Sequence, residues 1–124
     1  MTPQPADLRP SAVQQTLREI ERLLRAYGHT YEANLADIAA AAFARDPLTA
    51  CRQLNSAEWW NDRDAVCTID LAVEGGFTPE ARRDGRRLRR ALVDVFTTMR
   101  AYGERNDSGE LIVSQLQKWL ESHL

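Results

Sequence analysis

The stretch that decides the fold is TPEARRDGRRLRRALVDVFTTMRAY, residues 78–102. It opens with Thr78-Pro79-Glu80, which combines a capping residue, proline at the first helical position and an acid in the first turn. Small and apolar residues then recur at alternating steps of four and three, namely Ala81, Gly85, Leu88, Leu92, Val95, Met99 and Tyr102. This spacing predicts one long helix with a continuous apolar seam. Gly103 follows directly and predicts the end of the helix.

The N-terminal part of the chain predicts two helices. The first begins at Ser11, where Ser11 and Gln14 form a possible capping box, and it ends at Gly28. Its apolar face consists of Val13, Leu17, Ile20, Leu24 and Tyr27. The second helix is expected over residues 30–44. Its predicted buried stripe consists of Tyr31, Leu35, Ile38, Ala42 and Phe43.

Two shorter patterns predict two more helices. Asp46-Pro47 supplies an N-cap followed by proline at the first helical position, so a short helix over residues 47–54 is expected to bury Leu48, Cys51 and Leu54. Residues 106–109 are predicted to form a turn before a last helix over 110–122. The apolar residues of that helix are Leu111, Ile112, Leu116, Trp119 and Leu120.

Together these patterns predict an all-α fold, a compact bundle of about five helices. Each apolar stripe covers only one side of its helix, so the stripes must face one another. Residues 55–78 are the irregular central segment, and residues 65–73 within it fit a strand or a helix equally well. Residues 1–10 hold three of the five prolines and are expected to be a flexible leader before one domain over 11–124.

The bulk composition excludes several classes of protein. The formal net charge of −2 argues against a dedicated nucleic-acid binder. No secretory signal and no membrane-spanning apolar run is present, so a cytoplasmic location is expected, with no membrane partner. Cys51 and Cys67 are expected to be buried thiols in a reducing compartment. We expect no cofactor, and the spacing of the acids matches no metal-binding loop.

The charged residues segregate along the chain. An acidic stretch carries Glu58, Asp62, Asp64 and Asp70, with Arg63 as the one base from residue 55 to residue 80. Six arginines follow on the helix over 79–102, namely Arg82, Arg83, Arg86, Arg87, Arg89 and Arg90. The acidic stretch favours a basic partner. The arginines indicate either a docking surface for phosphate, nucleic acid or an acidic protein, or a solvated outer face.

Two adjacent tryptophans, Trp59 and Trp60, precede the acidic stretch. Neighbours on a helix point about 100° apart, so they cannot both enter one core from it. Either one packs inward while the other is an exposed anchor for a partner, or both are buried under different parts of the fold.

The segment LNSAEWW, residues 54–60, followed by Thr68-Ile69-Asp70-Leu71, resembles a family of small bacterial helical proteins of unknown function. Members of that family carry Trp-Trp, a glycine-rich turn and a Ser-Ile/Leu-x-Asp-Leu segment. Residues 61–65 here, NDRDA, replace the glycines, and Thr68 stands near the serine. The resemblance covers roughly residues 50–105 and implies an immunity protein of a toxin system.

We therefore expect a non-enzymatic protein-binding module, an immunity protein that blocks a cognate toxin domain. No catalytic motif is present in the sequence. Glu58, Asp62, Asp64 and Asp70 would contact the toxin, with Trp59 or Trp60 as the anchor. Three alternatives remain open: nucleic-acid or nucleotide binding through the arginines, an enzyme using Asp70 or Glu74, and a structural protein that oligomerises through the seam of residues 81–102.

Overall fold

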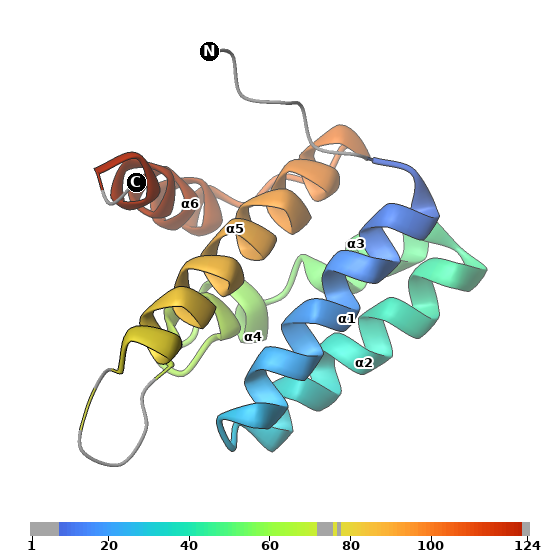
Figure 1. Ribbon diagram of the computed structural model, residues 1–124. Helices are drawn as coiled ribbons and strands as arrows, with labels where there is room; N and C mark the ends of the chain where they lie inside the picture. The colour runs from blue at the N-terminus through green and yellow to red at the C-terminus, as the bar shows by residue number, and fades with distance from the viewer. Residues whose placement is uncertain (1–7, 72–75, 77, 123–124) are drawn as a thin grey trace.

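The computed structural model describes residues 8–71, 76 and 78–122. Within these ranges the chain forms six α-helices and one short 3-10 helix, and the predicted all-α bundle is confirmed (Figure 1). The elements are α1 (Pro10–Ala26), α2 (Thr30–Arg45), α3 (Pro47–Leu54), α4 (Ala57–Trp60), η1 (Val66–Thr68), α5 (Pro79–Ala101) and α6 (Asp107–Ser122). The predicted flexible leader falls largely on residues 1–7, outside the described residues.

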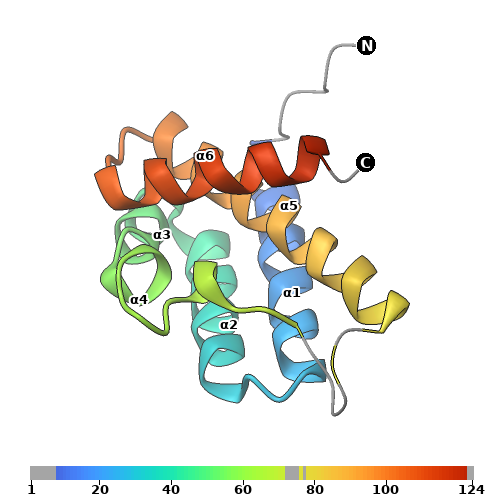
Figure 2. The ribbon, with the colours of Figure 1, turned by 90° about the vertical axis from the view of Figure 1, so that its left-hand side faces the viewer.

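The helices form a layered arrangement. α1 and α2 lie side by side, α5 packs against α1, and α6 crosses α5 on the side away from α2 (Figures 1 and 2). α3 contacts both α2 and α5, and α4 reaches α6. No helix within the described ranges has both the length and the apolar character needed to cross a membrane.

The long helix α5 matches its prediction. Ala81, Leu88, Leu92, Val95 and Met99 are all buried within the chain. Thr78 accepts a hydrogen bond from the backbone N–H of Ala81 at 3.0 Å, and the helix ends before Gly103, whose φ is +90°. This seam packs inside one chain, so its buried residues are not exposed for pairing with a second chain.

Helix α1 also follows its predicted stripe, since Val13, Leu17, Ile20 and Leu24 are buried. The predicted capping box at its start is wrong. The helix begins at Pro10, and its N-cap is Arg9, which makes no side-chain capping bond. Proline suits this position because the amide hydrogen it lacks would have no partner there.

The buried side of α2 matches the predicted one in part. Ala42 and Phe43 are buried as predicted and Leu35 is half-buried against the core, but Tyr31 is 63% exposed and Ile38 is 58% exposed. The other buried residues of the helix are Ala33, Ala36, Ala39 and Ala40. Alanines suit the inner side because their short side chains let the backbones of neighbouring helices approach closely.

Three further details of the predicted helices need correction. Leu48 of α3 and Leu111 of α6 were expected in the core, and both are exposed. Helix α6 begins at Asp107, so residues 106–109 are its cap and first turn. The Asn106 side chain accepts a hydrogen bond from the Gly109 N–H at 2.8 Å, which satisfies one of the free donors of that turn.

The central segment contains more helix than predicted. It begins with the single turn α4, and η1 occupies part of residues 65–73, where strand and helix were both open. Residues 69–71 have no regular structure, and residues 72–75 and 77, which include Glu74, lie outside the described residues.

Both tryptophans are buried, so the prediction of an exposed tryptophan anchor is wrong. Trp60 faces α5, where its ring meets that of Phe96 at a centroid distance of 5.0 Å, and its Nε1 donates to the Leu54 carbonyl at 2.9 Å. Trp59 lines a hollow together with Leu35 and Ile38 of α2, and its ring centroid lies 6.2 Å from that of Trp60. The two neighbouring rings therefore pack near each other, with Trp60 against α5 and Trp59 beside α2.

Cys51 and Cys67 are free thiols, and both are buried as expected. Burial raises the pKa of each thiol to about 11, because it disfavours the charged thiolate. At neutral pH both cysteines are therefore protonated and act as small apolar side chains.

Candidate functional site

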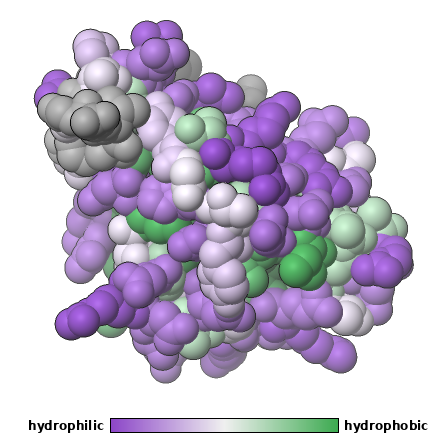
Figure 3. All heavy atoms as spheres, turned by 90° about the horizontal axis from the view of Figure 1, so that it is seen from below, coloured by the Kyte–Doolittle hydropathy of each residue, from purple (hydrophilic) through white to green (hydrophobic). Residues whose placement is uncertain are grey.

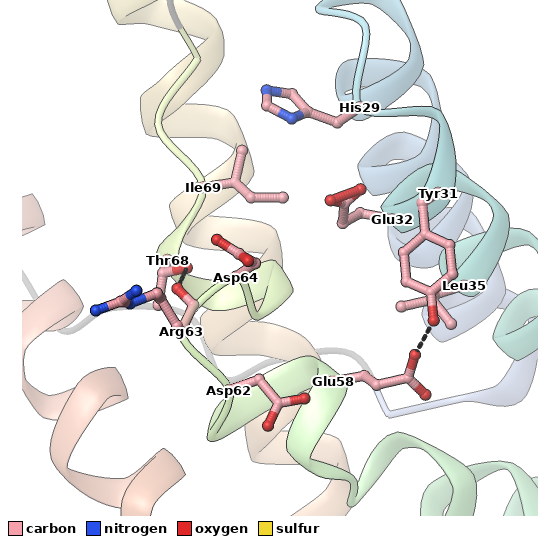
Figure 4. A pocket seen from close by; sticks show the side chains of 10 residues that line it. All are labelled: His29, Tyr31, Glu32, Leu35, Glu58, Asp62, Arg63, Asp64, Thr68 and Ile69. Atoms are coloured by element: carbon pink, nitrogen blue, oxygen red, sulfur yellow. Dashed lines mark hydrogen bonds between the residues drawn. The ribbon is translucent and has the colours of Figure 1, made fainter.

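A hollow of about 810 Å³ opens between the start of α2 and the segment that joins α4 to η1 (Figure 4). Its two walls come from parts of the chain about thirty residues apart. The α2 side contributes His29, Tyr31, Glu32 and Leu35, and the other side contributes Glu58, Asp62, Arg63, Asp64, Thr68 and Ile69. We call this site the acidic hollow.

The structure divides the predicted acidic set. Glu58, Asp62 and Asp64 all line the acidic hollow. Asp70 lies elsewhere: its side chain is 64% exposed, and its Oδ1 accepts a hydrogen bond at 2.9 Å from Arg89 of α5. The structure therefore brings three of the four predicted carboxylates together and places Asp70 beside Arg89 instead.

Sequence reasoning missed the α2 wall. Glu32 brings a fourth carboxylate, and in Figure 4 it points across the hollow toward Asp64. Tyr31 donates a hydrogen bond from its hydroxyl to the Glu58 carboxylate, which connects the two walls. No sequence signal joins residue 32 to residue 64, because only the tertiary fold brings α2 to this segment.

The carboxylates of the hollow lack basic partners. Within the described ranges, Glu32, Asp62 and Asp64 form no ion pair, and the partner of Glu58 is the neutral Tyr31 hydroxyl. Arg63 lines the hollow, but its guanidinium extends away from Glu32 and Glu58 (Figure 4). The excess negative charge also acts on Tyr31: the hydrogen bond to Glu58, and then the charges of Glu58, Glu32 and Asp62, raise the pKa of its phenol.

Some carboxylates elsewhere on the surface are paired. Glu19 of α1 lies 2.8 Å from an Arg87 guanidinium nitrogen, Glu110 of α6 lies 3.2 Å from Arg100, and Asp37 pairs with Arg18. Other exposed carboxylates form no ion pair within the described ranges, namely Glu80, Asp94, Asp107 and Glu121. The acidic hollow differs in that it gathers four carboxylates without basic partners in one concave site.

Some of the arginines of the predicted basic surface form contacts with other elements of the same chain. The Arg89 guanidinium lies 4.0 Å from the centre of the Trp119 ring and also pairs with Asp70. Arg86 lies 5.9 Å from the same ring, and Arg87 pairs with Glu19 and Asp84. Arg82, Arg83 and Arg90 are exposed. Half of the six arginines therefore hold α1, α5 and α6 together.

A second hollow of about 280 Å³ adjoins the first, and the two share Leu35 and Glu58. It is lined mainly by apolar surface, with Ile38 and Ala39 of α2 on one side and Trp59 of α4 on the other. Both hollows follow the outer side of α2 and together form one groove. The molecular face shown in Figure 3 is largely hydrophilic, with hydrophobic atoms in small separate patches.

The arrangement of these groups limits what the hollow can bind. The described residues contain no group of three or more His, Cys, Asp or Glu side chains placed to hold a metal ion. The carboxylates are spread along two walls, and several cationic groups on an extended surface match that spread better than a single ion does.

In comparisons with known proteins, no family model, no curated protein and no solved structure matches the chain.

Proposed function

We propose that this chain is a non-enzymatic binding module that covers a basic surface of a partner protein with its acidic hollow. The carrying observation is the gathering of carboxylates in one concave site. Glu32, Glu58, Asp62 and Asp64 line this site without basic partners inside the described ranges, whereas Glu19 of α1 and Glu110 of α6 have arginine partners. Unpaired carboxylates in a hollow form a negative potential that attracts a cationic surface and speeds encounter with it.

In its narrower form the proposal is that the partner is a toxin domain and the chain is its immunity protein. This form rests on the family resemblance of residues 54–60 and 68–71 and on the acidic hollow itself. Enzymes that act on nucleic acids need basic clefts to hold phosphates, so an acidic protein can block such a cleft by occupying it.

A nucleic-acid function has less support. The arginines that would contact phosphate are partly engaged, because Arg87 and Arg89 pair with carboxylates and Arg86 lies near Trp119. Replacing Arg86 and Arg90 with glutamate would abolish a salt-dependent complex with DNA or RNA if one existed. We expect instead no such complex at physiological salt.

The test is co-purification with the product of the neighbouring gene, followed by gel filtration. We expect a stable complex that is lost in the double variant Asp62→Lys/Asp64→Lys, because reversed charges would repel a basic surface. Glu121→Lys at the exposed end of α6 is the matched control and should leave the complex intact. A neighbouring product that is not a toxin would refute the narrower form, and no complex on the column would refute both forms.

A further inference from the structure

The outer side of α2 carries an apolar seam that is only partly covered in the described structure. Tyr31, Leu35 and Ile38 are separated by steps of four and three residues. Tyr31 and Ile38 are both more than half exposed, whereas Leu35 is half-buried and packs against the core. Single exposed apolar residues are ordinary, but two exposed residues in register with a half-buried third along one helix are typical of a surface that packs against something.

The spacing of this seam indicates the shape of what would cover it. Steps of four and three residues are the pattern by which one helix packs along another at a shallow angle. The seam of α5 has the same spacing, and within this chain it packs against other helices. A helix laid along α2 is therefore the element that fits Tyr31, Leu35 and Ile38.

The residues that line the groove also indicate which side chains a helix bound there would carry. It extends from His29 to Ala39, which is about 15 Å or three helical turns of α2. At one end are Glu32, Asp62 and Asp64, and at the other are Ile38 and Trp59, with Glu58 shared between them. A complementary helix has apolar residues on one face and lysine or arginine concentrated toward one end.

We propose that the groove along α2 binds an amphipathic basic helix of a partner protein, with Tyr31, Leu35 and Ile38 as the apolar contacts and the acidic hollow as the charge contact. This inference rests on the proposed binding function and specifies which structure the partner presents. Charge complementarity favours a separate partner over a second copy of this chain, because the arginine-bearing helix α5 already buries its own apolar seam.

The probe is a labelled synthetic peptide of about 18 residues, long enough to form a helix. It carries leucine at steps of four and three on one face and lysine toward one end. The control peptide has the same composition in scrambled order. Fluorescence anisotropy with the full chain should show binding of the ordered peptide that is at least about tenfold tighter than that of the scrambled one, because only the ordered peptide presents one apolar face.

Two matched variants test whether the peptide binds along α2. Ile38→Asp puts a charge on the exposed seam and should weaken binding of the ordered peptide by about tenfold or more. Leu111→Asp makes the same change at an exposed leucine of α6 and should leave binding unchanged. Because both side chains are exposed, neither variant should unfold the chain, and circular dichroism checks this.

Each other outcome overturns the inference. Equal binding of the two peptides, no binding, or no effect of Ile38→Asp would show that α2 recognises no amphipathic helix. A dimer of the chain alone that disappears in Ile38→Asp would assign the seam to a second copy. A native complex that is lost in Asp62→Lys/Asp64→Lys but keeps its affinity in Ile38→Asp would refute this inference while the proposed function stands.

Discussion

Helices α5 and α2 carry the same apolar spacing and use it in opposite ways. On α5 the seam is buried, and Arg87 and Arg89 on its flanks pair with carboxylates. On α2 the seam is exposed at Tyr31 and Ile38, and carboxylates beside it have no basic partner within the described ranges. The difference shows that periodicity identifies an apolar face without identifying what covers it.

The residues on the opposite face explain this difference. The other face of α5 is rich in arginine and cannot be buried, so the seam is the one side that can face the core. Helix α2 instead has two apolar faces, and its alanine face packs inside. The surplus face is then free to serve recognition.

The largest expected effect on stability comes from shortening one apolar side chain in the α5 seam and comparing it with the same kind of change in the α2 seam. Leu92→Ala in α5 removes a fully buried side chain and leaves a cavity, so it should lower the free energy of unfolding by about 2–5 kcal/mol. Ile38→Ala in α2 should change it by less than about 0.5 kcal/mol, because that side chain is already exposed. Denaturation in urea measures both. Equal losses would mean that the α2 seam is part of the core.

The second test compares two helical glycines. A Cβ at Gly109 of α6 would lie 2.5 Å from a ring carbon of buried Phe96, so Gly109→Ala should destabilise the fold by about 1–3 kcal/mol through overpacking. At Gly85 of α5 the nearest atom is an Arg89 guanidinium nitrogen at 3.8 Å. Gly85→Ala should therefore stabilise the chain by roughly 0.5–1 kcal/mol. Thermal unfolding of the two variants gives the signs, and two gains would show that α6 does not approach α5 this closely.

The sequence alone predicts those parts of the fold that depend on local patterns. The start of α5 at Thr78-Pro79, its seam and its end at Gly103 are all local, and all are confirmed. The inner face of α2 was predicted only at Ala42 and Phe43, because the periodicity emphasises large apolar side chains whereas most of the buried residues of this helix are alanines.

The candidate site was only half predictable for the same reason. Glu58, Asp62 and Asp64 are close in sequence and could be grouped, but Glu32 joins them only through the packing of α2. Asp70 was grouped with them by proximity in sequence, although Arg89 holds it on another surface. The burial of both tryptophans depends on the position of α4 between two helices, which no local pattern encodes.

A third test compares a paired with an unpaired carboxylate. Asp70→Asn removes the partner of Arg89 and should cost at most about 1 kcal/mol, because the pair is exposed to solvent. Asp64→Asn should cost nothing or slightly stabilise the chain, since it relieves repulsion in the acidic hollow. Thermal unfolding at low salt should separate the two variants, and high salt should remove the difference. A larger loss for Asp64→Asn would reveal a basic partner in the hollow.

The smallest effect concerns the titration of Tyr31. Its folded-state pKa is raised, so the stabilisation from its bond to Glu58 is complete below the ordinary phenol pKa of about 10 and is lost as the pH rises through the raised value. In Glu58→Gln the amide oxygen still accepts the hydrogen bond but carries no charge, so the pKa of Tyr31 should fall. Phenolate absorbance, with Tyr31→Phe as the reference, isolates this group. Tyr27, whose pKa is raised by its bond to Asp84, should titrate unchanged. An unaltered Tyr31 curve would mean that Glu58 contributes no charge to the hollow, and the acidic wall on the α4 side would then reduce to Asp62 and Asp64.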